Sequence, residues 1–135
     1  MSNGIKNMNP EKHINNRYNL EDRLLDYAAL IVKLTEHLPT TRAGNHIAGQ
    51  LLRSGTSPLS NHGEAEAAES RQDFIHKLSI SLKELRESRR WLRLIHKVMN
   101  VPSIPELATA LTETDELIRI FSASIKTAEK NEPHK

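Results

Sequence analysis

The fold of this 135-residue chain is decided by residues 74–99, FIHKLSISLKELRESRRWLRLIHKVM. Large apolar side chains and serines recur there every three or four residues, and neither Gly nor Pro interrupts the stretch. This spacing predicts one amphipathic helix of about seven turns that turns a single face toward a hydrophobic core. The predicted core face consists of Phe74, Leu78, Ser81, Leu85, Ser88, Leu92, Ile95 and Met99.

The same helix carries a second apolar stripe, about 110° around its axis from the core face. A lone bundle buries one stripe per helix, so this second stripe would be exposed in a monomer. It favours a contact between subunits, where aromatic side chains are common. The alternative is a wider core within one chain. The stripe consists of Ile80, Trp91, Leu94 and Val98.

A stripe of basic side chains lies roughly opposite the core face. Its members follow one another at steps of three or four residues, which places them on one side of the helix. Arg and Lys side chains in such a row suit contacts with successive phosphates of a nucleic acid. The alternative is a solvated face that Glu84 and Glu87 neutralise. The stripe consists of Lys83, Arg86, Arg90, Arg93 and Lys97.

The remaining sequence contains three further amphipathic segments joined by short links. Short links favour neighbouring helices, so we expect an all-α, antiparallel, up-down-up-down four-helix bundle. The helices are expected near residues 20–38, 41–69, 71–100 and 103–130. Their predicted N-caps are Asn19, Thr40 or Thr41, Ser70 and Ser103. The bundle is expected to occupy residues 19–130, between a flexible N-terminal arm at 1–18 and a polar tail at 131–135.

The second helix is unusual because it contains Pro58 and several polar residues. Pro58 cannot donate to the carbonyl four residues before it, so we expect a kink there and not a clean break. Four polar side chains share one side of this helix by their spacing. They are expected to form an internal polar network around the kink, and the alternative is a ligand or RNA site. The set consists of Arg53, Ser57, Asn61 and Glu64.

Part of the chain resembles a known family. The matching residues are QLLRSGTSPLSN at 50–61, then Glu64, then DFIHKLSISLKE at 73–84. They resemble the small four-helix-bundle proteins encoded in intervening sequences of bacterial 23S ribosomal RNA genes. The accessory variability determinant of diversity-generating retroelements looks like a relative. In this chain the proline is shifted to position 58, and Ala67-Ala68-Glu69-Ser70 replaces the usual Gly-rich link.

The resemblance implies an up-down-up-down bundle whose copies assemble as a ring of five. It also implies RNA or DNA as a partner, which is the usual suggestion for the family. For the retroelement relatives a reverse transcriptase is a further candidate partner.

Composition excludes several classes of site. The chain has no Cys, which removes disulfides, thiolate metal sites and Cys nucleophiles. No phosphate-binding loop, nucleophile elbow or zinc-protease motif occurs, so we expect no catalytic residues, no cofactor and no enzyme activity. One row of potential metal ligands has helical spacing, but we interpret it as solvated charges at helix ends. The row consists of His62, Glu66, Glu69, Asp73 and His76.

Together these patterns predict a non-catalytic, oligomeric bundle that binds RNA or another nucleic acid through the basic stripe. The alternative is a structural or protein-interaction oligomer without nucleic-acid binding. The net charge is only +2, so the argument depends on where the basic residues lie. No apolar run is long enough to span a membrane, and a cytoplasmic location is expected.

Overall fold

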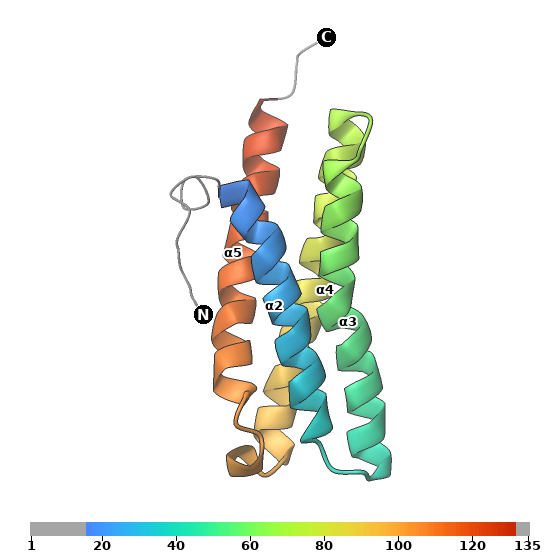
Figure 1. Cartoon of the computed structure of the whole chain (residues 1–135), viewed down its shortest axis with the longest axis vertical. Helices are drawn as coiled ribbons and strands as arrows, with labels where there is room; N and C mark the ends of the chain where they lie inside the picture. Colours follow the sequence, from blue (N-terminus) through green and yellow to red (C-terminus); the bar gives the residue numbers. More distant parts are fainter. Residues whose placement is uncertain (1–15, 132–135) are drawn as a thin grey trace, which may run out of the picture.

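The computed structural model describes residues 16–131, with side chains from Leu20 onward. Within that range the chain forms four antiparallel α-helices and no strand, which confirms the all-α bundle (Figure 1). The helices are α2 (Asn16–Glu36), α3 (Arg42–Glu66), α4 (Arg71–Val98) and α5 (Leu107–Lys130). A short 3₁₀ turn, η1 (Val101–Ser103), joins the last two. None of these helices is both long and apolar enough to cross a membrane.

Two of the predicted helix starts are confirmed by their caps. The Thr41 hydroxyl accepts a hydrogen bond from the Gly44 N–H at 3.0 Å, at the start of α3. The Ser70 hydroxyl accepts one from the Asp73 N–H at 3.0 Å, at the start of α4. Each bond satisfies a backbone donor that the first helical turn leaves free.

The two other predicted starts are wrong. Helix α2 begins at Asn16, so Asn19 lies inside the helix and does not cap it. Ser103 belongs to the 3₁₀ turn, because its N–H donates to the carbonyl of Asn100 at 3.0 Å, and its hydroxyl donates to the same carbonyl at 2.7 Å. The Glu106 carboxylate contacts Nδ1 of His37 at 2.8 Å, and α5 starts only at Leu107. The part of the expected arm at residues 1–15 lies outside the described residues.

The core runs the length of the bundle and draws on every helix. On α4 it follows the predicted face: Leu78, Leu85, Leu92 and Ile95 are buried, and Phe74 and Met99 pack against them. Tyr27 of α2 and Phe121 of α5 are the largest fully buried side chains. Burying these apolar surfaces supplies most of the free energy that holds the four helices together.

Buried hydroxyl groups cross the middle of this apolar core. The hydroxyls of Ser54 on α3 and Ser88 on α4 lie 2.8 Å apart. The Tyr27 hydroxyl on α2 lies 2.6 Å from that of Thr114 on α5. Burial raises the pKa of Tyr27 to about 12, and hydrogen bonding to the hydroxyls of Thr114 and Ser88 acts in the opposite direction. Each helix therefore contributes one polar side chain to a layer inside the bundle.

Helix α3 continues through Pro58, which confirms that the proline does not break it. One turn earlier, α3 comes very close to α2. A Cβ atom added to Gly55 would lie 2.8 Å from Cγ2 of Ile31, so only glycine fits without a shift. This close approach lets α3 pack tightly against α2.

Candidate nucleic-acid interface

The basic stripe lies on the outer face of α4. All five of its side chains, Lys83, Arg86, Arg90, Arg93 and Lys97, are exposed. Within residues 20–131, none of them forms an ion pair with Asp or Glu. The stripe is therefore a row of cations whose charge is open to solvent and to a ligand.

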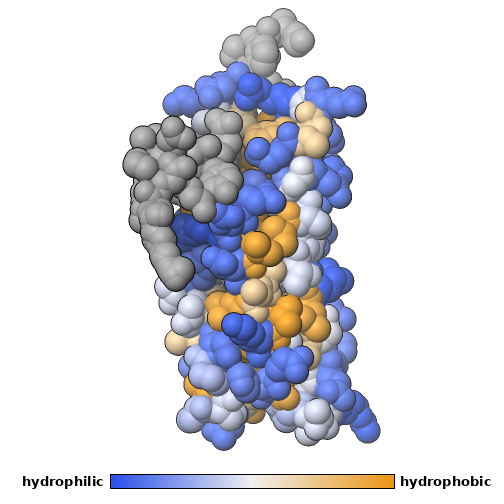
Figure 2. Space-filling view, in the orientation of Figure 1, coloured by the Kyte–Doolittle hydropathy of each residue, from blue (hydrophilic) through white to orange (hydrophobic). Residues whose placement is uncertain are grey.

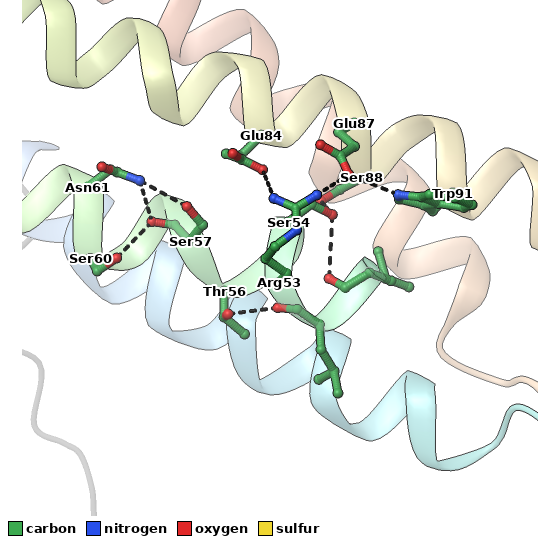
Figure 3. A network of polar contacts seen from close by, with 12 residues as sticks. Arg53, Ser54, Thr56, Ser57, Ser60, Asn61, Glu84, Glu87, Ser88 and Trp91 are labelled. Atoms are coloured by element: carbon green, nitrogen blue, oxygen red, sulfur yellow. Dashed lines mark hydrogen bonds and ion pairs between the residues drawn. The ribbon is translucent and has the colours of Figure 1, made fainter. Parts of the chain in front are cut away.

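The two acids expected to neutralise the stripe face α3 instead (Figure 3). Glu84 accepts a hydrogen bond from Nη1 of Arg53 at 3.0 Å, and Glu87 pairs with Nη2 of the same side chain. Glu87 also accepts a bond from the Trp91 indole N–H at 3.1 Å. On the other side of α4, Arg89 reaches Asp115 of α5 at 3.3 Å. The acids beside the stripe thus bind groups outside it.

The four polar residues of α3 separate into three independent contacts. Arg53 binds α4 as described, and Glu64 receives a bond from Lys77 of α4 at 2.6 Å. The Asn61 amide donates to the Ser57 carbonyl at 3.1 Å and to its hydroxyl at 2.9 Å, within α3 itself (Figure 3).

The prediction of one network around the proline was therefore wrong. Pro58 leaves the carbonyl of Ser54 without its helical donor, and no side chain among the described residues bonds that carbonyl. The four polar side chains share one side of α3, beside its contact with α4, because residues three or four positions apart lie on the same side of a helix.

The second apolar stripe of α4 is divided between the core and the surface. Ile80 and Trp91 are half-buried, and the Trp91 ring packs edge-on against His46 of α3 at a centroid distance of 5.9 Å. Leu94 and Val98 are 40% and 60% exposed. The wider-core interpretation describes Trp91, which packs against the core, whereas Leu94 and Val98 remain available for a subunit contact.

The sequence of the chain also matches a known protein family. A family model described as 23S rRNA-intervening sequence protein matches residues 19–123. The chain belongs to the 23S rRNA-intervening sequence protein family. This confirms the resemblance seen between Gln50 and Glu84.

A crystal structure with the same fold supports the assignment to the 23S rRNA-intervening sequence proteins. It is that of a protein of unknown function from the S23 ribosomal protein family of Bacteroides thetaiotaomicron. The two chains are 34% identical, the TM-score is 0.71, and the match covers 79% of this chain and 98% of that one. No curated protein matches the chain.

Two features of this chain were missed by sequence reasoning. Leu25 and Val32 of α2 are 54% and 42% exposed, and Figure 2 shows apolar side chains among polar ones on the face where α2 lies in front. Their seven-residue separation was the available signal, because it places them on one side of a helix.

The second missed feature is His62. It was interpreted as one of several solvated charges, but only 2% of its surface is exposed. Its Nδ1 lies 3.0 Å from Oε1 of Glu21 on α2. The described residues contain no group of three or more side chains able to hold a metal ion, so the row from His62 to His76 does not converge on one point.

Proposed function

We propose that this protein is a non-catalytic, oligomeric bundle that binds RNA or another nucleic acid through the basic stripe of α4. The observation that carries the proposal is that five exposed cations share one helix face while the neighbouring acids are engaged elsewhere. Arg86, Arg90 and Arg93 favour phosphate because a guanidinium can bind two phosphate oxygens at once.

The length of the stripe suits several phosphates. From Lys83 to Lys97 it extends about 21 Å along the helix axis. One stripe alone would bind weakly, and several copies in an oligomer would raise the overall affinity by avidity. No exposed aromatic side chain stands beside the stripe among the described residues, so we expect little preference for base sequence.

The test is binding of RNA and DNA at several salt concentrations, measured by fluorescence anisotropy. Affinity is expected to fall steeply with salt because released counterions drive the association. The variant Arg86→Gln/Arg90→Gln/Arg93→Gln should bind much more weakly. If all three side chains contact phosphate, the slope of log affinity against log salt should lose about 2 to 3 per bound subunit.

The matched control is Lys33→Gln/Lys126→Gln/Lys130→Gln, which removes the same charge from exposed positions on α2 and α5. It should bind nearly as well as the wild type. Equal losses in the two variants would show an effect of net charge alone and contradict a specific stripe. Absence of binding by the wild type at low salt would reject the proposal.

The alternative function, a structural or protein-interaction oligomer, is favoured by a different observation. Exposed apolar pairs occur on two helices, Leu94 with Val98 on α4 and Leu25 with Val32 on α2. Such pairs suit contacts between subunits whether or not a nucleic acid binds. An oligomer without any affinity for RNA or DNA would support this alternative.

A further inference from the structure

A cleft opens at the end of the bundle where α3 turns into α4. Helix α2 begins lower along the bundle axis than the ends of the other three helices (Figure 1). At this end the described part of α2 leaves faces of α3, α4 and α5 uncovered. The cleft has a volume of about 730 Å³, which is large enough for a small organic molecule.

The floor of the cleft is apolar. It includes Leu20 of α2, Phe74 and Leu78 of α4, and Phe121 of α5. Leu78 and Phe121 belong to the core, while Phe74 is only half-buried. An apolar group that entered the cleft would exclude water from the half-buried Leu20 and Phe74, and the Phe74 ring favours a flat group.

A buried histidine stands in the wall of the cleft. The ring of His62 packs edge-on against Phe121, with centroids 6.3 Å apart. Its Nδ1 is held by Glu21, and since an ionised carboxylate only accepts, Nδ1 carries the hydrogen. Nε2 has no hydrogen-bond partner within the described residues, and the carboxylate of Glu66 lies 3.8 Å away. A neutral His62 thus offers an unused acceptor beside an apolar floor.

The rim of the cleft is rich in acceptors. Glu66 and Glu69 line it, and neither pairs with a Lys or Arg among the described residues. Arg71 is the one basic side chain among the lining residues, and the nearby Lys77 is occupied by Glu64. A ligand that carries a negative charge would be repelled by the two carboxylates, whereas a cation would be attracted.

From these groups we infer that the cleft binds a small organic cation, an aromatic group that carries an ammonium. The ring lies against the half-buried side chains of Phe74 and Leu20, and the ammonium donates to Nε2 of His62 and to the carboxylates of Glu66 and Glu69. This site has the opposite charge preference to the basic stripe and uses different residues, so either proposal can fail without the other.

The test is an NMR titration of the full chain, at neutral pH, with three probes that share a phenyl ring. Phenethylamine is cationic, phenethyl alcohol is neutral and phenylacetate is anionic. Phenethylamine is expected to bind about threefold more tightly than the alcohol, as one partly exposed ion pair allows, and phenylacetate should bind least. The shifted amide signals should belong to residues that line the cleft.

Two pairs of variants separate the contributions that the rim carboxylates and the apolar floor make to binding. Glu66→Gln/Glu69→Gln should remove the preference for the amine, while Asp26→Asn/Glu36→Gln, with equal charge removed from exposed positions on α2, should keep it. Ala123→Trp adds bulk at an exposed lining position and should abolish binding of every probe, while Ala29→Trp on the exposed face of α2 should not. Equal binding of amine and acid, shifts outside the cleft, or no shift with any probe would overturn the inference.

Discussion

At the scale of single residues, Ser81 and Ser88 of α4 differ in their hydrogen bonding. Both are fully buried on the core face and lie seven residues apart. Ser88 shares a hydrogen bond with Ser54, whereas the hydroxyl of Ser81 has no partner among the described residues. Burying a hydroxyl costs desolvation free energy, and without a partner no hydrogen bond offsets that cost.

We therefore expect opposite results from the same substitution at these two positions. Ser81→Ala should leave the free energy of unfolding unchanged or raise it by up to about 1 kcal/mol. Ser88→Ala should lower it by about 1 kcal/mol, because Ser54 and Tyr27 each lose a hydrogen bond to its hydroxyl. Urea denaturation followed by circular dichroism measures both values. Similar losses of unfolding free energy for the two variants would contradict the assignment of Ser81 as the hydroxyl without a partner.

Tyr27 gives a prediction about pH. Its pKa is raised from 10.0 to about 12, chiefly by burial, so the folded protein keeps the phenol proton where the unfolded chain loses it. The stabilisation is complete below pH 10.0 and is lost as the pH rises toward about 12. Over this interval the melting temperature of the wild type should fall more steeply than that of Tyr27→Phe. Parallel curves would show that Tyr27 is not the group responsible.

At the scale of the helix, the glycines of α3 are not equivalent. An added Cβ at Gly55 would meet the side chain of Ile31 at 2.8 Å, whereas at Gly49 nothing lies within 4 Å. Gly55 therefore allows the close contact between α2 and α3. Gly49 makes no such contact and is less favourable in a helix than alanine.

Alanine substitutions should separate these two effects. Gly55→Ala is expected to lower the free energy of unfolding by about 1 to 3 kcal/mol, because the fully packed core must shift. Gly49→Ala should raise it by about 0.5 to 1 kcal/mol through helix propensity. Thermal and urea denaturation provide the values. The Gly55→Ala loss should shrink in an Ile31→Ala background, and an unchanged loss would place the clash elsewhere.

At the scale of the whole molecule, the exposed apolar pairs predict self-association. Leu94 and Val98 lie on α4 and Leu25 and Val32 on α2, so both pairs are available to other copies. If the two pairs meet each other in neighbouring copies, the contact is head-to-tail, and such contacts form a ring when the rotation between copies closes. The ring of five implied by the family resemblance is one arrangement that satisfies this geometry.

Light scattering tests the assembly directly. We expect the wild type to be several times heavier than a single 15.3 kDa chain at micromolar concentration. Leu94→Glu/Val98→Glu should lower the mass without loss of helicity, because these side chains pack little within the chain. The control Ala108→Glu/Thr109→Glu, at exposed positions of α5, should keep the wild-type mass. A monomeric wild type would reject the oligomer.

The sequence by itself determined the features that depend only on the spacing of residues along one helix. The 3.6-residue period placed the α4 core face and the basic stripe, because side chains three or four positions apart share a side of any α-helix. Thr41 and Ser70 were identifiable as caps because a cap bonds only its own first turn. Family membership followed from a local motif between Gln50 and Glu84.

Only the tertiary structure decided which groups meet across helices. The pairing of Glu87 with Arg53, the burial of His62 and the packing of Trp91 on His46 all depend on how far each helix is rotated and displaced along its neighbour. Those two quantities follow from the fit of side chains at every contact along the bundle. For this reason the period of one helix predicted that Glu87 stands beside the basic stripe, but not that it binds α3.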